Sequence, residues 1–274
     1  MSKDVLKVQV GSAPKVETLR INNLSIAFGG LKAVDDLSFH INEGEIYGLI
    51  GPNGAGKTTV FNCITQFYKP DQGEVIFRTN KGEEVNLVGY KTHNIIPLGL
   101  VRTFQNVELI KDLSLLDNIL VGAHTQYKAG LFANSFRTPK AKREERVMTE
   151  KAIAILEFLG IRDKSGEWAG GQPYGVLKKV ELGRTLMSNP KLIVLDEPAA
   201  GLNDTETMEL SKLIRQIREE YQCSILLVEH DMRLVMDICD RICAISFGKK
   251  LAEGSAKEIQ GNKDVQEAYL GKED

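Results

Sequence analysis

The chain has 274 residues, of which 42% are hydrophobic and 26% charged, and its 35 Lys and Arg against 37 Asp and Glu leave a net charge of −2. At about 150 residues per domain, this length is ample for a large buried core, which excludes the small disulfide-stapled classes. The balanced charge gives the whole molecule no attraction to nucleic acid, so we expect no nucleic-acid partner.

Short β-branched or apolar runs alternate along the chain with longer amphipathic runs, which is typical of an α/β sheet covered by helices. The short runs predict strands at 19–28, 37–41, 45–50, 74–77, 100–104, 192–196, 224–229 and 242–246. The amphipathic runs predict helices at 57–66, 206–221 and 232–239. Between about 115 and 186 the strand signals stop, and helical periodicity appears at 147–159 and 174–187. We interpret the charge run KAKREER at 140–146 as a solvated helix face.

Apolar runs such as 192–195 and 225–228 are far shorter than the about 20 residues that a membrane-spanning helix needs. The first residues, MSKDVLKVQVGSAPK, carry scattered charges and lack the apolar core of a secretory signal. The four cysteines form no C-x-x-C pair, and we interpret them as buried thiols in a reducing compartment: Cys63, Cys223, Cys239 and Cys243. We therefore expect a cytosolic chain.

A phosphate-binding loop is the strongest motif. Residues 51–59 read GPNGAGKTT and fit G-x-x-x-x-G-K-[ST] between an expected strand and an expected helix. In such a loop, backbone N–H groups and the helix N-terminus face the phosphates, a lysine adds a mobile cation, and a hydroxyl can bind Mg²⁺. The predicted nucleotide-binding residues are Gly51, Pro52, Asn53, Gly54, Ala55, Gly56, Lys57, Thr58 and Thr59, with Thr58 also a metal ligand.

Two acids end the apolar run KLIVLDEP at 191–198. Because side chains alternate along a strand, we expect Asp196 and Glu197 to point to opposite sides and to do different work. Asp196 is placed to hold Mg²⁺ through water, and Glu197 to polarise the attacking water as a catalytic residue. The alternative is a strand that ends in two solvated acids.

His230 follows the next expected strand, in the run LLVEHDM. Ligands gather at the carboxyl ends of the strands in open α/β sheets, so an imidazole there could bond the γ-phosphate and hold the attacking water. We predict His230 to be catalytic, although a lone histidine is more often structural.

The motifs GPNGAGKTT, RTFQ at 102–105, PYG at 173–175, LIVLDE and EHD, in this order, resemble those of the ATP-binding cassette (ABC) ATPases over about residues 19–251. The resemblance implies ATP and Mg²⁺ as cofactors. It also implies that Gln105 is a catalytic residue and metal ligand, touching Mg²⁺ and the attacking water. Phe28 matches the aromatic residue that stacks on adenine; a core position on an early strand is its alternative.

The signature segment departs from the usual LSGGQ. By resemblance, Pro173, Tyr174 and Gly175 would meet the nucleotide across a dimer, with Pro173 in place of the serine that bonds the γ-phosphate. A proline suits the start of a helix, so the helix N-terminus could still face the partner's phosphates. Asn203 likewise replaces an aspartate and loses its charge.

A narrower likeness is to the ATPase subunits of branched-chain amino acid importers, carried by FGGLKAVDDLSF, GPNGAGKTTVFNCITQFYKP, LDEPAAGLN and the terminal DVQEAYLG. It implies a peripheral subunit on the cytoplasmic face of the inner membrane. It also implies membrane permease partners, a second ATPase subunit, identical or similar, and, indirectly, an external substrate-binding protein. Lipopolysaccharide-export ATPases look similar, and we retain them as the alternative.

We expect a phosphate-loop NTPase core, with a mixed sheet, helices on both faces and an antiparallel β subdomain, interrupted by an α-helical subdomain. The expected boundaries are an N-terminal extension at 1–18, the core at 19–104 and 188–252, the helical subdomain at 105–187 and a C-terminal helical tail at 253–274.

Two rival classes fit less well. A soluble ABC protein acting on nucleic acid or the ribosome usually carries two cassettes or coiled-coil arms, and this chain has no sustained heptads. A phosphate-loop kinase would need an acceptor pocket, and a GTPase an N-K-x-D in register. Neither rival explains the signature segment or His230.

Overall fold

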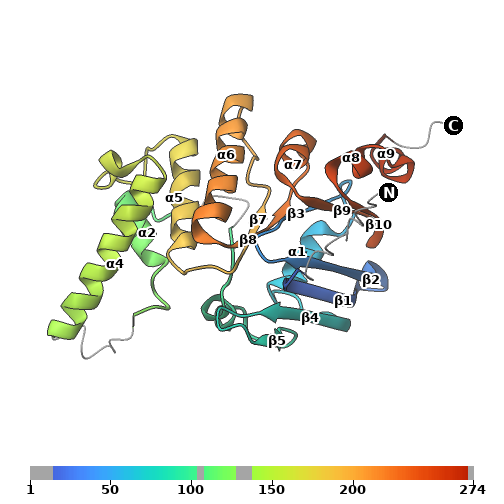
Figure 1. Ribbon diagram of the computed structural model, residues 1–274, viewed down its shortest axis with the longest axis horizontal. Coiled ribbons are helices and arrows are strands. Elements are labelled where there is room, and N and C mark those ends of the chain that lie inside the picture. Colours follow the sequence, from blue (N-terminus) through green and yellow to red (C-terminus); the bar gives the residue numbers. More distant parts are fainter. Residues whose placement is uncertain (1–14, 104–107, 128–137, 271–274) are drawn as a thin grey trace, which may run out of the picture.

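The computed structural model describes residues 15–103, 108–127 and 138–270 (Figure 1). The predicted site residue Gln105 and most of the predicted N-terminal extension lie outside these ranges. The strands are β1 (Glu17–Phe28), β2 (Leu31–Asn42), β3 (Ile46–Ile50), β4 (Gln72–Arg78), β5 (Glu84–Asn86), β6 (Leu100–Arg102), β7 (Leu192–Asp196), β8 (Ser224–Val228), β9 (Arg241–Ser246) and β10 (Lys249–Gly254). The α-helices are α1 (Lys57–Ile64), α2 (Leu115–Val121), α4 (Pro139–Phe158), α5 (Tyr174–Leu186), α6 (Asp204–Tyr221), α7 (Met232–Ile238), α8 (Ala256–Gln260) and α9 (Lys263–Leu270).

Two sheets form the core of the described chain. A six-stranded sheet has the order β10-β9-β3-β8-β7-β6 and is parallel except for β10, which pairs antiparallel with β9. An antiparallel four-stranded sheet has the order β2-β1-β4-β5. This mixed sheet with a separate antiparallel sheet confirms the predicted fold class.

Helix α1 packs between the two sheets. Its buried Val60, Phe61 and Ile64 share one apolar core with strands of both sheets. The parallel strands are buried along their length because this core covers one face and helices α5, α6 and α7 cover the other. Since α1 starts directly after the loop that follows β3, this packing fixes where the loop lies.

Helices α2, α4 and α5, which we call the helical arm, lie together at one end of the molecule (Figure 1). Ile155 and Leu156 of α4 and Val180 of α5 are buried in the same apolar cluster as the helix-covered face of the main sheet. Asn118 of α2 is fully buried, and its side chain bonds the backbone of Ile110, Leu113 and Ser114. Apolar packing therefore anchors the arm to the main sheet, and one buried amide fixes the segment that leads into α2.

Most predicted elements are confirmed, and the differences have local causes. Helix α4 begins at Pro139, because Thr138 caps it and the charge run at 140–146 forms its mostly exposed first turns. Strand β2 begins at Leu31, before the predicted 37, across an irregular register with β1. Strands β5 and β10 are polar edge strands without a buried residue, and the apolar pattern did not reveal them. The four cysteines are buried and free, as predicted.

The predicted domain boundaries stay a prediction, and β10 crosses the one placed at 252. Across the described ranges, no helix combines the length and apolar character that spanning a bilayer requires.

Candidate active site

The phosphate-binding loop follows β3 and closes onto α1 as the sequence predicts. Gly56 is the residue before the helix and has a φ of 102°, a left-handed conformation that favours glycine. A Cβ on Gly51 would lie 2.2 Å from the carbonyl oxygen of Ile245, and one on Gly56 would lie 2.5 Å from that of Ala33. The loop thus needs glycine at both positions because neighbouring backbone comes within contact distance.

Lys57 is the first residue of α1 and is 8% exposed. Its Nζ donates to the carbonyl oxygens of Gly51, at 2.7 Å, and Pro52, at 3.2 Å. Burial lowers the pKa of Lys57, while the nearby carboxylates of Glu197 and Asp196 act in the opposite direction. The ammonium group therefore bonds the loop, in a part of the site where the two acids favour its positive charge. Thr58, next along the helix, is exposed.

Asp196 is the last residue of β7, and Glu197 lies just beyond the strand. Burial raises the pKa of Asp196 to about 6, with Glu197 adding to the rise and Arg102 opposing it. The prediction relied on strand alternation between Asp196 and Glu197, and this reason is wrong because the strand ends at Asp196. Glu197 has a φ of 45°, outside the strand conformation, while its N–H still donates to Val228 of β8 at 2.8 Å. A left-handed residue, not alternation, directs the Glu197 side chain.

His230 lies just past β8, at the same sheet edge. Its Nδ1 is 3.7 Å from Oε1 of Glu197 and 3.8 Å from Oε2 of Glu229, and its side chain is 58% exposed. The structure therefore brings His230 and Glu197 together, as the predicted shared role requires. Glu229, for which the sequence predicts no role, is fully buried. Its only sequence signal is an acid placed directly before the histidine at the end of an apolar strand.

The signature segment lies at the start of α5, with Pro173 as the residue preceding the helix. Pro173 and Tyr174 are exposed. A Cβ on Gly201, in the loop after Glu197, would lie 3.5 Å from the Tyr174 ring, so this loop runs past the signature. Asn203 ends the loop and caps α6, accepting from the N–H of Glu206 at 3.0 Å.

Phe28 ends β1 and is 47% exposed, which argues against its alternative as a core residue. Its ring meets that of Tyr68 edge to face, with centroids 5.3 Å apart. An exposed ring held in this way offers a flat face to a base.

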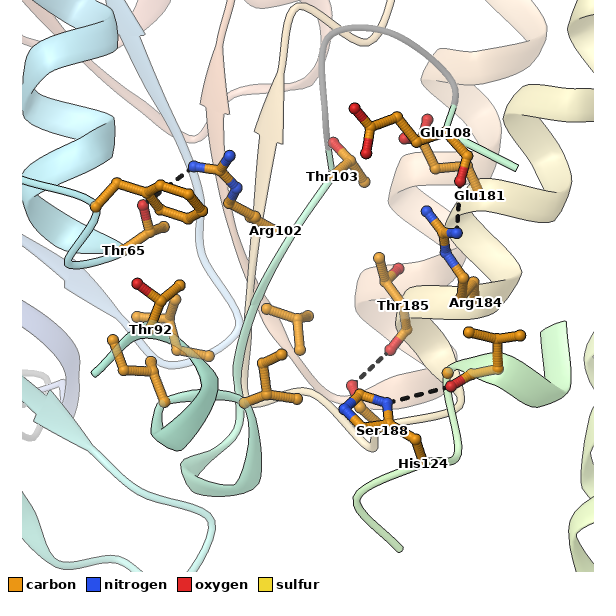
Figure 2. A pocket seen from close by; sticks show the side chains of 17 residues that line it. Thr65, Thr92, Arg102, Thr103, Glu108, His124, Glu181, Arg184, Thr185 and Ser188 are labelled. Atoms are coloured by element: carbon orange, nitrogen blue, oxygen red, sulfur yellow. Dashed lines mark hydrogen bonds between the residues drawn. The ribbon is translucent and has the colours of Figure 1, made fainter. Parts of the chain in front are cut away.

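A groove of about 310 Å³ separates the β6 side of the core from the helical arm (Figure 2). Arg102 lies on the core side, where its guanidinium is 3.8 Å from the centroid of the Phe67 ring. On the arm side Arg184 donates to the backbone oxygen of Glu108 at 2.7 Å. Val121 and Ile96 contribute apolar surface to this groove.

A glycine-rich loop that closes onto a helix N-terminus, with two acids and a histidine at the same edge of a mostly parallel sheet, defines a phosphate-loop nucleoside triphosphatase. The comparisons with known proteins narrow this class. The ABC transporter family matches residues 34–200, and a family described as branched-chain amino acid ATP-binding cassette transporter matches residues 249–274. The chain belongs to the ABC transporter family and is an ATP-binding ATPase cassette.

Relatives of known name are similar over nearly their full length. The high-affinity branched-chain amino acid transport ATP-binding protein LivG of Salmonella typhimurium is 44% identical over 253 residues, which are 92% of this chain and 97% of that protein. BraF of Pseudomonas aeruginosa, with the same description, is 43% identical over the same shares. Among solved structures, the ADP conformation of an ATP-binding cassette of an ABC transporter is 34% identical, with a TM-score of 0.80 over 94% of this chain and 100% of that one.

Proposed function

We propose that the chain hydrolyses ATP to drive the import of branched-chain amino acids through membrane permease partners. The convergence of the phosphate loop, Asp196, Glu197 and His230 at one edge of the main sheet carries the proposal for hydrolysis. The substrate class comes from the similarity to LivG and BraF and from the family match at residues 249–274.

In the proposed site, backbone N–H groups of the loop at 53–59 bind the phosphates, and the Lys57 ammonium exchanges its bonds to Gly51 and Pro52 for phosphate oxygens. Glu197 accepts a hydrogen bond from the attacking water and polarises it. His230, 3.7 Å from Glu197, holds the γ-phosphate and that water in line. Phe28 stacks on the adenine.

The residues present fit Mg²⁺ as a cofactor. Thr58 offers an exposed hydroxyl and Asp196 a carboxylate, and oxygen ligands are those that Mg²⁺ prefers. The raised pKa of Asp196 shows a site where negative charge is unfavourable, which a bound cation would relieve. When bound, Mg²⁺ would neutralise charge on the phosphates. Gln105 completes the proposed ligand set but lies outside the described residues.

Two ATPase subunits would sandwich the nucleotide. The exposed Pro173 and Tyr174, with Gly175 behind them, form an outward-facing helix start that can meet the phosphates bound to a second subunit. Because Pro173 has no hydroxyl and makes no side-chain cap, the backbone N–H groups of α5 would supply that contact. The partner would be a second copy or a similar chain.

We place the permease contact at the groove between the core and the helical arm (Figure 2). The groove has apolar walls, and it joins the two parts that would move relative to each other on ATP binding. A cytoplasmic loop of the permease that binds in this groove would be displaced by that movement. This contact would hold the chain peripherally at the cytoplasmic face of the membrane, where an external binding protein acts on the permease only.

Glu197→Gln tests the hydrolysis proposal. The variant keeps the size of the side chain but cannot accept a proton, so we expect ATP affinity within about 2-fold of the unsubstituted chain and a loss of turnover of at least ~100-fold. The trapped ATP should also hold two subunits together in size-exclusion chromatography. Glu220→Gln, an exposed acid on α6, is the matched control. Turnover of Glu197→Gln near the normal rate would refute the catalytic role.

Uptake of radiolabelled leucine tests the substrate class separately. Cells that carry the chain with its permease partners should lose uptake on Glu197→Gln. ATP turnover without any branched-chain amino acid uptake would leave the ATPase intact and overturn the substrate proposal.

A further inference from the structure

We propose that Glu229 is a positioning residue of the hydrolysis site, whose buried carboxylate ties the backbone of His230 to the loop that follows Glu197. The inference rests on the proposed function, because Glu229 would act through His230.

The carboxylate of Glu229 is fully buried and divides its two oxygens between two loops. Oε1 accepts from the N–H of Ala199, in the loop after Glu197, at 2.8 Å. Oε2 accepts from the N–H groups of His230, at 2.9 Å, and Asp231, at 3.1 Å. Three backbone N–H groups thus donate to one buried carboxyl group, and together they fix its position.

The place of this link in the sheet explains what it does. Strands β7 and β8 remain paired as far as Asp196 and Val228, and the N–H of Glu197 still donates to Val228 at 2.8 Å. At this bond the two segments that follow β7 and β8 leave the sheet as loops. The loop after β7 begins with Glu197, and the loop after β8 carries His230. The Glu229 carboxylate crosses between these loops just where the ladder ends.

The link matters because the His230 ring itself is loosely held. Its side chain is 58% exposed, and its Nδ1 lies 3.7 Å from Glu197 and 3.8 Å from Glu229, beyond normal hydrogen-bond length. The direction of the ring toward a γ-phosphate therefore depends on the backbone from which it extends. Glu229 holds that backbone at a fixed position relative to the loop of Glu197. The two side chains proposed to act on one water are therefore held in a fixed arrangement.

A glutamine cannot replace this carboxylate. Three N–H donors face the two oxygens, and an amide group offers an acceptor on one side but only a donor on the other. In Glu229→Gln either Ala199 or the His230 and Asp231 pair would face an N–H₂ group and lose its bond. Shape and volume stay the same, so the substitution removes the link with little change in packing.

The test is steady-state ATP hydrolysis by the full chain under conditions in which the unsubstituted chain turns over. For Glu229→Gln we expect kcat to fall about 10- to 100-fold, because small misplacements of catalytic groups have effects of this size. KM for ATP should stay within about 2-fold, since the phosphate loop is untouched.

Glu45→Gln is the matched control. Glu45 is also buried and accepts from the backbone N–H of Asn42 at 2.6 Å, but it precedes β3 at the opposite edge of the sheet. It should leave kcat unchanged. A loss of kcat in Glu45→Gln equal to that in Glu229→Gln would overturn the proposal in favour of general destabilisation.

His230→Ala separates this inference from the proposed function. If Glu229 acts through His230, Glu229→Gln should lower kcat no further in the His230→Ala background. If the fold-losses of kcat from the two single variants multiply in the double variant, the positioning role is overturned. An unchanged kcat in Glu229→Gln alone would also overturn it. A normal kcat in His230→Ala would instead refute the proposed role of the histidine itself.

Discussion

Gly51 of the phosphate loop and Gly183 of the helical arm are both closely packed, but against different kinds of atoms. At Gly51 a Cβ would meet the backbone oxygen of Ile245 at 2.2 Å, and backbone cannot move without shifting a strand. At Gly183, in α5 of the arm, a Cβ would meet the Cδ1 atoms of Ile119 and Leu159 at 2.8 and 2.9 Å. These are the ends of side chains, which can adopt other rotamers.

The difference between these two positions fits the work proposed for each region. A site that places a water against a phosphate needs fixed positions, whereas an arm that passes movement to a partner needs only to stay attached. Substitutions in matched pairs, one in each region, therefore test whether the two regions differ in this way.

The largest effect is expected from a pair of lysines. Lys57 and Lys151 each donate Nζ to two oxygens, Lys57 to the phosphate loop and Lys151 of α4 to Met187 and Asn189. Burial lowers the pKa of both, but only Lys57 has Glu197 and Asp196 among the causes. Lys57→Ala should weaken ATP binding by at least ~100-fold, about 2.7 kcal/mol, in titration calorimetry.

Lys151→Ala is the control from the arm. We expect it to lower the free energy of unfolding by about 1–2 kcal/mol, because it removes two hydrogen bonds, and to leave ATP affinity unchanged. Unchanged ATP affinity in Lys57→Ala would refute the phosphate-loop role, and equal losses in both variants would erase the contrast between the regions.

The next largest effect is expected on stability, from alanine substitutions at Gly51 and Gly183. Gly51→Ala should lower the free energy of unfolding by about 1–3 kcal/mol, as overpacking against backbone does. Gly183→Ala should change the free energy of unfolding by no more than about 1 kcal/mol. The helix gains up to about 1 kcal/mol from alanine, and this offsets the cost of moving two side chains. Chemical denaturation of both variants checks this, and a larger loss at Gly183 would show that the arm is the more rigid region.

The sequence predicted the parts of this molecule whose signal is local. The phosphate loop, β7 and the start of α5 each lie in a short run whose residue pattern indicates the structure. Strand β10 was missed because a polar edge strand lacks an apolar pattern, and its pairing with β9 depends on the fold. The charge run at 140–146 does form a solvated helix face, as predicted, although the apolar period that indicates a helix begins only at 147.

At the site, the same limit applies to contacts made in three dimensions. Asp196 could be found from the end of an apolar strand, but the left-handed φ of Glu197 could not. Glu229 looks in sequence like one more acid in EHD. Only the fold buries it and brings Ala199 from 30 positions away to its carboxylate.

The smallest effect is expected at Asn203, where the core and the signature meet. Its side chain and that of Glu206 form a capping box at the start of α6, and Ser255 with Glu258 forms the same box at α8. Asn203→Ala and Ser255→Ala should each cost about 1 kcal/mol of unfolding free energy, since each leaves a helix N–H without its acceptor.

Only the Asn203 box lies on the loop that runs from Glu197 past Tyr174, so only Asn203→Ala should also slow turnover, by about 2- to 5-fold, in a steady-state ATPase assay. Asn203→Asp keeps an acceptor and restores a charge at the helix start, so its stability should match that of the unsubstituted chain within about 0.5 kcal/mol. A rate for Asn203→Asp that differs from the unsubstituted rate would then report the charge alone. Slower turnover in Ser255→Ala as well would show that stability, not the position of the loop, sets the rate.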